Sequence, residues 1–479
     1  MRSHTRSHPR DTGSPRDITI VGAGIVGLAA ARYLRASGCE ARITIHDRAD
    51  APGGRLMSER MGDDRLIVEY GAGRMHRQRH RRLHELCSEL GLPLAPFSYP
   101  AQLRQPGEAA TAPVRPDYRS VVATLIAAGA RESDRRRSFA DFCTEVVGAP
   151  QARDLQRCSG YDTLLHPRLP VEAGLSILCH HPETESLFHE EGSGAQWFTL
   201  QDGFQDLAWA VAMQLAGDIE FSYRSELRHV EPATGDDGGY LLEFAADGVR
   251  RIERAGAVIL ATPLQNTQLL SGLDKISPRH ASTHLEAVPL MKGVVQFDRA
   301  WWPASERSRC VIADTPLRKL YLTGGSHALW FYCDGASARR MHSLLRGETS
   351  FPLALVEQHL GVALPCDVRV RRSRWKFWEH GISFDSEART DDLDRGFNEI
   401  APGLAICSDV YTDHLGWIEG GLESAEAIAR HWQGDESCHR APAPLCSMPL
   451  RADGQRISAG LHWTGSRASF HDSTNLEFS

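Results

Sequence analysis

Three glycines spaced as Gly22-Ala23-Gly24-Ile25-Val26-Gly27 follow a short apolar segment near the start of the chain. Residues 18–21 are typical of a buried strand, residues 28–37 of an alanine-rich helix that stops at Gly38, and residues 41–45 of a second strand. This order predicts a strand, helix, strand unit with parallel strands. A glycine pattern between a strand and a helix is far more specific than the same pattern alone, so it predicts a dinucleotide site.

Each part of this pattern has its own physical task. Gly22 permits the tight turn, Gly24 lets the backbone approach a pyrophosphate, and Gly27 lets helix and strand pack closely. Ile25 and Val26 begin the helix, whose N-terminal end is positive and therefore faces the negative phosphates.

Two features farther along the chain extend the predicted nucleotide site. Asp47 ends the second strand, where its carboxylate can accept hydrogen bonds from a ribose diol. Gly53 and Gly54 let the chain pass under a dinucleotide, and the neighbouring Arg55 can pair with its phosphates through two parallel bonds.

Composition excludes several other classes of protein. The 479 residues are too many for one compact core, and a formal net charge of −7 offers no electrostatic footprint for nucleic acid. The 11 cysteines are odd in number and show neither CxxC pairs nor metal-ligand spacing, which favours free thiols in a reducing cytosol. The longest apolar run, residues 18–34, is interrupted and too short for a membrane span. We therefore expect a cytoplasmic protein without a metal site.

Periodicity along the rest of the chain indicates several units. Residues 83–198 look mainly helical, with proline-rich loops near 92–116; a mixed strand region runs to about 335, and helix follows to about 360. The remaining predicted elements are a hairpin at 240–244 and 249–254, strands at 257–261, 366–375 and 403–408, and a helix at 420–432. Residues 1–16 and 433–479 are expected to be a disordered leader and tail.

Further motifs connect the glycine unit to a known family. Residues 257–263 and the segment Cys407-Ser408-Asp409, with residues 416–425 after it, resemble the returning strand and the closing motif of the flavin amine oxidase superfamily. The resemblance implies an α/β fold: a two-dinucleotide-binding, Rossmann-like FAD domain (17–80, 199–262 and 372–432), an inserted, mainly helical domain (81–198) and a mixed-sheet substrate-binding domain (263–371).

The closing motif also suggests how FAD is held. A helix beginning near Gly420 would aim its N-terminal amides at the flavin pyrimidine edge, with Trp417 and Ile418 beside the flavin. Asp409 stands where many members have Glu, and it would contact the ribityl chain or the phosphates. Cys407 lies on a predicted strand and is interpreted as a core residue, so the FAD is expected to be non-covalent.

The substrate side resembles the L-amino-acid oxidase type within this superfamily. Glu69-Tyr70-Gly71-Ala72-Gly73-Arg74 follows the glycine pair at the interval that places Gly73 and Arg74 at the flavin's substrate face. A planar guanidinium suits a carboxylate because it forms two parallel charge-assisted bonds. More closely, the chain resembles the L-tryptophan oxidases of violacein biosynthesis, through segments such as Gly160-Tyr161-Asp162, Leu290-Met291-Lys292-Gly293, Trp330-Phe331-Tyr332 and residues 407–414.

That resemblance implies roles for individual residues. Arg74 and Tyr332 would hold the substrate carboxylate, and Lys292 would sit beside flavin N5 and fix a water there. His181 and Tyr161 would line the substrate cavity, with Trp417 as part of its wall. The catalytic set would be Arg74, Lys292 and Tyr332.

The implied reaction is the oxidation of L-tryptophan, or another aromatic amino acid, by hydride transfer from the α carbon to flavin N5. The product would be the imine of indole-3-pyruvate, with O₂ reduced to hydrogen peroxide. In the violacein relatives the imine passes to a coupling enzyme, so a downstream partner is one expectation and hydrolysis to the keto acid the other. Whether the protein forms a homodimer stays open.

Alternatives remain at this point. The chain could oxidise another amino acid or a simple amine, or act as a related desaturase or monooxygenase, or use the nucleotide fold for binding alone. Arg74 could be a surface arginine, Lys292 a solvated lysine and His181 a loop histidine. Tyr161, Tyr332 and Trp417 could be core aromatics.

Overall fold

The computed structural model describes residues 17–62, 66–104, 111–113, 116–132, 134, 136–180, 196–234, 238–277, 284–348, 350–387 and 390–434. The leader, nearly all of the tail and His181 lie outside these residues, so the predictions made for them stay predictions. Within the described part of the chain, no helix is both long and apolar enough to cross a bilayer.

A six-stranded sheet forms the nucleotide-binding half, in the order β10-β2-β1-β14-β21-β20. Its strands are β10 (Glu220–Ser222), β2 (Arg42–His46), β1 (Asp17–Val21), β14 (Ala257–Leu260), β21 (Leu404–Ile406) and β20 (Asn398–Ala401). All neighbours pair in parallel except β20 and β21, which are antiparallel. The parallel β1 and β2 confirm the predicted strand, helix, strand unit. The order, with β1 between β2 and β14, is that of a Rossmann-type fold.

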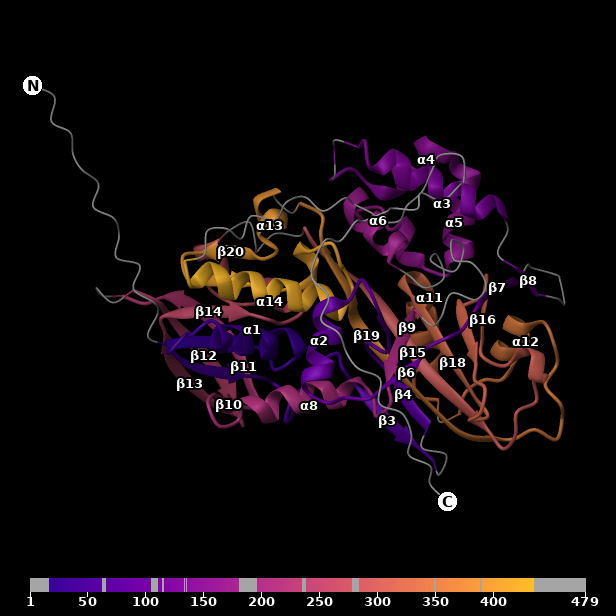
Figure 1. The fold of residues 1–479 in the computed structure, drawn as a ribbon, viewed down its shortest axis with the longest axis horizontal. Helices are drawn as coiled ribbons and strands as arrows, with labels where there is room; N and C mark the ends of the chain where they lie inside the picture. Colours follow the sequence, from indigo (N-terminus) through magenta and orange to yellow (C-terminus); the bar gives the residue numbers. More distant parts are fainter. Residues whose placement is uncertain are drawn as a thin grey trace, which may run out of the picture.

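Helices α1 (Ile25–Ala36) and α14 (Ile418–Trp432) lie side by side over this sheet (Figure 1). Small residues allow this approach: a Cβ added at Gly421 would lie 2.6 Å from a methyl carbon of Val26. Leu28 on α1 and Leu422 on α14 are fully buried in the shared core. Because burial of a leucine side chain contributes about 1.5–3 kcal/mol, this apolar stripe holds the first and last helices of the domain together.

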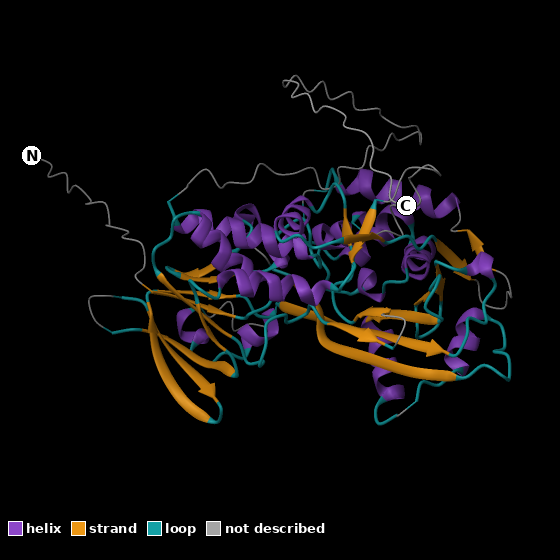
Figure 2. Cartoon of the chain, turned by 60° about the horizontal axis from the view of Figure 1, so that its bottom comes forward, coloured by secondary structure: helices purple, strands orange, loops and turns teal. Residues whose placement is uncertain are grey.

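A three-stranded antiparallel sheet adjoins the nucleotide-binding sheet (Figure 2). It consists of β11 (Ser225–Pro232), β12 (Tyr240–Ala246) and β13 (Val249–Ala255). The predicted hairpin is confirmed, since Ala246 pairs with Val249 around Asp247 and Gly248. Both turn residues have positive φ, 49° and 78°, which the Asp-Gly sequence favours in a two-residue hairpin turn.

The largest sheet has seven strands in the order β19-β15-β18-β17-β16-β7-β8. They are β19 (Val370–Asp385), β15 (Leu285–Phe297), β18 (Ala328–Asp334), β17 (Lys319–Leu322), β16 (Arg309–Ala313), β7 (Ala101–Arg104) and β8 (Thr111–Pro113). The pairing is antiparallel apart from the parallel pair β16 and β7, so the sheet is mixed, as expected. Helices α11 (Gly335–Leu345) and α12 (Ala354–Leu360) follow β18 and fall where helix was predicted.

Shorter elements join these units. A two-stranded sheet pairs β3 (Ser58–Met61) with β4 (Leu66–Glu69), and a three-stranded sheet orders β5 (Met75–His76), β9 (Trp197–Leu200) and β6 (Leu94–Pro96). Among the residues that the structure describes, the remaining α-helices outside the helical insertion are α2 (Arg81–Glu89), α8 (Phe204–Leu215), α9 (Leu264–Gln268), α10 (Leu273–Ile276) and α13 (Thr390–Arg395).

Four helices in the described part of the insertion lie above the large sheet (Figure 1): α3 (Pro116–Gly129), α4 (Phe139–Val147), α5 (Ala149–Ser159) and α6 (Val171–Cys179). Their core includes Phe139 and Leu175, and Gly174 packs so closely that an added Cβ would lie 2.2 Å from the Phe139 ring.

The prediction of loops near residues 92–116 was wrong in part, because β6, β7 and β8 lie there. β6 pairs with β9, and β7 pairs with β8 and β16. Partners distant in sequence therefore create structure that local periodicity does not reveal.

Strand pairing crosses the predicted domain limits. The limit at residue 372 falls inside β19, which pairs with β15 from Leu285 and Asp385 to Phe297 and Val370. Likewise β7, from the range expected to be helical, completes the large sheet. The domain boundaries stay a prediction.

Asp334, at the end of β18, anchors the helical insertion to the large sheet. Its fully buried carboxylate accepts hydrogen bonds from the backbone N–H groups of Asp162, at 2.8 Å, and Thr163, at 3.1 Å, and from the Thr163 hydroxyl. Burial raises the pKa of Asp334, the negative charge of Asp162 adds to the rise, and the hydrogen bonds from Thr163 and Asp162 oppose it. The segment that ends in Tyr161 is thereby fixed against the sheet.

Replacement Asp334→Ala should lower the free energy of unfolding by about 3 kcal/mol, because three hydrogen-bond donors lose their buried acceptor. Urea unfolding followed by circular dichroism measures this change. The matched control is Asp274→Ala, at an exposed aspartate on α10, which should stay within about 0.5 kcal/mol of the parent. Equal unfolding midpoints for Asp334→Ala and the parent would contradict the anchoring role.

Candidate active site

A cavity of about 1270 Å³ runs from the glycine turn after β1 to the aromatic face of the large sheet. Most ligand pockets enclose about 300–1,000 Å³, so this one is large enough for more than a small molecule. Glycine loops and Asp47 line one end, and tyrosine, tryptophan and arginine side chains line the other.

At Gly22 and Gly27 the glycine turn leaves no room for a side chain. Gly22 has φ of +115°, and an added Cβ would lie 2.6 Å from the carbonyl oxygen of Ala261. A Cβ at Gly27 would lie 2.0 Å from the Gly22 carbonyl oxygen, so Gly27 packs behind the turn. At Gly24 the nearest atom would be 4.0 Å away, which leaves its backbone open to a ligand, and Gly54 passes under it with φ of +59°. These features fit a dinucleotide.

Asp47 is fixed at the carboxyl end of β2. One carboxylate oxygen accepts the Ala23 backbone N–H at 2.7 Å, and the other accepts that of Ala49 at 2.8 Å. The carboxylate therefore ties the glycine turn to the strand end, and both Asp47 and its loop line the cavity.

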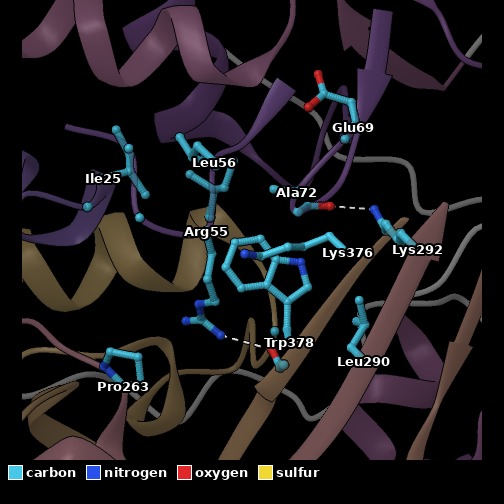
Figure 3. Close-up of a pocket in the computed structure, with 18 of the residues that line it drawn as sticks. Ile25, Arg55, Leu56, Glu69, Ala72, Pro263, Leu290, Lys292, Lys376 and Trp378 are labelled. Atoms are coloured by element: carbon cyan, nitrogen blue, oxygen red, sulfur yellow. Dashed lines mark hydrogen bonds between the residues drawn. The ribbon is translucent and has the colours of Figure 1, made fainter. Parts of the chain in front are cut away.

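Arg55 and Asp409 meet in the middle of the cavity lining. A guanidinium nitrogen of Arg55 lies 3.5 Å from Asp409, and another donates to the Gly381 carbonyl oxygen at 2.9 Å (Figure 3). Asp409 also accepts the backbone N–H of Gly416 at 2.7 Å, just before Trp417 and the first turn of α14. Ile418 and Trp417 line the cavity there.

Strand register places a row of polar side chains on one face of the large sheet. Lys376 pairs with Lys292, Lys292 with Tyr332, and Tyr332 with Lys319, so four neighbouring strands contribute to the row. Side chains two residues apart share a face, which puts Trp330 on the same face as Tyr332. Lys376, Lys292, Tyr332 and Trp330 all line the cavity.

Lys292 faces the loop that precedes Arg74 (Figure 3). Its ammonium donates a hydrogen bond to the Gly71 carbonyl oxygen. Burial lowers the pKa of Lys292, the positive charge of Arg74 lowers it further, and Glu69 opposes both. Burial conversely raises the pKa of Glu69, although its carboxylate accepts hydrogen bonds from Ser58 and Phe204.

Arg74 stands among aromatic side chains. Its guanidinium donates to the Tyr161 hydroxyl at 3.1 Å and to the Tyr321 hydroxyl at 3.3 Å. The rings of Phe97, Trp197 and Trp417 surround it, with centroids 5.6–5.9 Å from its central carbon. Arg74 is therefore not a surface arginine, which the sequence alone had left open. It lines the cavity, and the surrounding rings provide cation–π contacts.

Tyr332 and Tyr161 pack edge to face, with ring centroids 5.5 Å apart. The ammonium of the fully buried Lys319 lies 3.2 Å from the Tyr161 ring centroid and 5.5 Å from that of Tyr332. Burial raises the pKa of Tyr332 well above its usual value, while the nearby Arg74 charge lowers it. The phenol thus stays protonated and can donate a hydrogen bond.

Histidines support the wall behind Trp417. The fully buried His80 lies 4.8 Å from the Trp417 ring, and His180 stacks on His414 at 4.8 Å. Burial lowers the pKa of both His80 and His180 well below the usual value, and the other histidines add to this. His80 and His180 are therefore neutral packing groups at neutral pH.

The structure gathers most of the predicted residues. The following line the cavity: Gly22, Gly24, Ile25, Val26, Asp47, Gly54, Arg55, Gly73, Arg74, Tyr161, Lys292, Tyr332, Asp409, Trp417 and Ile418. Cys407 is buried, as expected of a core residue, but it directly follows β21 instead of lying on the strand, and it lines the cavity. Burial raises the pKa of its thiol to about 12. His181 lies outside the described residues, so its placement remains a prediction.

Sequence reasoning assigned no site role to several aromatic residues. Tyr321, Phe97 and Trp197 surround Arg74, and Trp378 lies beside Lys376 (Figure 3). The alternation of strand residues could have found Tyr321, because Lys319 and Tyr321 share a face, as do Trp330 and Tyr332. Phe97 follows a strand that periodicity did not reveal.

Comparison with known proteins agrees with this arrangement. A solved cyclohexylamine oxidase from Brevibacterium oxydans IH-35A superposes with a TM-score of 0.69 over 88% of this chain and 100% of that chain, at 18% identity. A putrescine oxidase bound to putrescine gives 0.64 over 88% and 99%, also at 18% identity. At these identities the likeness shows a shared fold, that of FAD-dependent amine oxidases with a Rossmann-type FAD-binding domain.

Two curated L-amino-acid oxidases match over short segments. The one from Mus musculus is 40% identical over 87 residues, which is 18% of this chain and 13% of that protein. The one from Daboia russelii is 33% identical over 88 residues, 18% of this chain and 17% of that protein. The chain thus matches less than a fifth of the length of either relative. The family model described as flavin containing amine oxidoreductase matches residues 25–431, which include every cavity-lining residue described above except Gly22 and Gly24. The chain therefore belongs to the flavin-containing amine oxidoreductase family.

Proposed function

We propose that the protein is an FAD-dependent L-amino-acid oxidase that acts on aromatic amino acids, with L-tryptophan as its best substrate. The observation that carries this proposal is the Arg74 guanidinium, which stands in an aromatic part of the same cavity that the glycine turn and Asp47 line. A cation at that point suits a substrate with a carboxylate, and the surrounding rings suit an aromatic side chain.

The cofactor is supported by the fit of the nucleotide end. The glycine turn accommodates a pyrophosphate, Asp47 a ribose, and Arg55 with Asp409 the middle of a dinucleotide. Bound FAD would supply the two-electron oxidation, taking hydride from the α carbon at N5 and passing the electrons to O₂ as hydrogen peroxide. Cys407 is a buried thiol of raised pKa, which favours non-covalent FAD.

In this proposal Arg74 and Tyr332 grip the substrate carboxylate. Arg74 offers a planar donor, and Tyr332 a protonated hydroxyl, since burial raises its pKa. Tyr161 and Tyr321 orient the guanidinium through their hydroxyls. Anchoring the carboxylate fixes the α carbon in one orientation, and orientation of this kind supplies much of the rate in a reaction that needs little acid or base.

Lys292 is proposed to hold a water near the reacting atoms. Because burial and Arg74 lower its pKa, the group can exchange a proton at a lower pH than an exposed lysine. Trp417 forms a wall of the substrate space, and the neutral His80 behind it keeps that wall apolar. His181 is proposed to line the same space.

A simple amine is the main alternative substrate, since the structural neighbours include cyclohexylamine and putrescine oxidases. Arg74 disfavours it, because an amine has no carboxylate to pair with this half-buried guanidinium. A related desaturase or monooxygenase would share the nucleotide end, so product identification separates those reactions. The immediate product would be an imine, which hydrolyses to the keto acid unless a coupling enzyme takes it.

A peroxide-coupled screen of the twenty amino acids, with tryptamine as the amine counterpart of tryptophan, tests this function. We expect peroxide and indole-3-pyruvate from L-tryptophan and far less peroxide from tryptamine. Arg74→Ala should lower kcat/KM for L-tryptophan about 100-fold or more, because the carboxylate loses a bidentate charged partner worth about 3 kcal/mol. Arg77→Ala, at an exposed arginine three residues away, is the matched control and should stay close to the parent.

Tryptamine turned over as well as tryptophan, or full activity in Arg74→Ala, would contradict the assignment. If peroxide formed only with non-aromatic amino acids, the proposed oxidase reaction would stand, but the proposed aromatic substrate would be refuted.

Asp47→Ala should weaken FAD binding about tenfold or more, because the ribose loses its acceptor and the backbone N–H of Ala23 loses the bond that shapes the turn. The fluorescence of released FAD, titrated against the apoprotein, measures the dissociation constant. Asp50→Ala, at an exposed aspartate three residues on, is the control and should bind FAD like the parent. Identical FAD affinity in Asp47→Ala would contradict the ribose assignment.

A further inference from the structure

A group of four aromatic side chains adjoins Arg74. Phe97 is next to Arg74, and Tyr99 packs on Phe97 with ring centroids 4.9 Å apart. Tyr99 also contacts the rings of Tyr321, at 5.5 Å, and Trp330, at 5.7 Å. All four aromatic residues line the cavity, so they form a chamber that continues from the proposed carboxylate site. We call Phe97, Tyr99, Tyr321 and Trp330 the distal chamber.

Two chain segments build the distal chamber. Trp330 and Tyr321 pair across β18 and β17, on the same face as Tyr332. Phe97 and Tyr99 come from the segment between β6 and β7 and lie over that face. The chamber is therefore supported by a sheet on one side, and its polar atoms are held in defined places.

The distal chamber carries hydrogen-bonding groups that its own residues leave available. The indole N–H of Trp330 is buried and has no hydrogen-bond partner among the described residues. Burial raises the pKa of Tyr99 above its usual value, so its hydroxyl keeps its proton and can both donate and accept. A buried N–H without an acceptor costs about 1–3 kcal/mol, which a ligand with a suitable acceptor or a bridging water would recover.

We propose that the distal chamber is the side-chain subsite and that it selects aromatic amino acids whose ring carries a hydrogen-bonding group over the plain phenyl ring. An indole N–H would donate to the Tyr99 hydroxyl, and a phenol oxygen would accept from the Trp330 indole N–H. The inference rests on the proposed function for the carboxylate position, since Arg74 places the acid group at the chamber's inner end. To that function the inference adds the class of side chain that is preferred and the two residues, Tyr99 and Trp330, that recognise it.

Selectivity of this kind follows from unequal desolvation. A phenyl ring would displace water from Trp330 and Tyr99 and leave both side chains without polar partners. An indole or phenol ring would instead replace the hydrogen bonds that the displaced water had made. Sites built to hydrogen-bond a ligand discriminate strongly against analogues that lack the polar atom.

The test measures substrate ratios on the FAD-bound enzyme. In Tyr99→Phe, the ratio of kcat/KM for L-tryptophan to that for L-phenylalanine should fall about tenfold, because one hydrogen bond specific to the indole is lost. In Trp330→Phe, the ratio for L-tyrosine to L-phenylalanine should fall by a similar factor. Tyr33→Phe removes a tyrosine hydroxyl on α1, away from the cavity, and should leave both ratios unchanged.

Binding of non-oxidisable acids separates this inference from the proposed function. Indole-3-propionate and 3-phenylpropionate carry the ring and the carboxylate but no amine, and calorimetry gives their affinities for each variant. The parent should prefer the indole acid, and Tyr99→Phe should reduce that preference about tenfold. If the binding preference shifts while no amino acid is oxidised, the distal chamber stands and the oxidase proposal fails. If amino acids are oxidised and neither ratio changes in Tyr99→Phe or Trp330→Phe, or if the parent binds neither acid, the inference is overturned.

Discussion

The guanidinium of Arg74 is the interaction on which the proposed substrate site depends. Arg74 follows Gly71 and Gly73 in the same loop. Its guanidinium donates to the hydroxyls of Tyr161 and Tyr321 and is surrounded by aromatic rings. A charge in such surroundings is poorly hydrated, so its attraction for a carboxylate is much stronger than at the surface. Each unit of the fold contributes to this arrangement: the nucleotide-binding half the loop, the helical insertion Tyr161, and the large sheet Tyr321.

The large sheet determines which side chains can face that charge. Its register sets Lys376, Lys292, Tyr332 and Lys319 in one row across four strands, and Trp330 and Tyr321 in the next row on the same face. A slip of one residue in any strand would turn its contribution to the other face. Asp334, at the end of β18, then fixes the insertion to the same sheet through Asp162 and Thr163, so Tyr161 and Tyr332 keep their contact.

Much of the nucleotide end could be predicted from the sequence, and parts of the substrate end could not. The glycine turn, Asp47, Gly54, Arg55 and the closing motif are short, local patterns whose conformations follow from steric limits on glycine. Strands β7 and β8 were missed because short strands reveal themselves through partners far away in the chain. Phe97 and Tyr99 lie between β6 and β7, and their place in the cavity depends on the same pairing.

The sequence by itself determined that this chain builds a dinucleotide cradle with an arginine a short distance beyond it, because glycine turns and strand, helix, strand units are set by local backbone geometry. The tertiary structure decided what surrounds the arginine. Tyr161, Tyr321, Trp197 and Phe97 come from four separate segments, and only long-range strand pairing and helix packing bring such segments together. That is why a motif could predict Arg74, whereas the aromatic chamber next to it had to be seen in the fold.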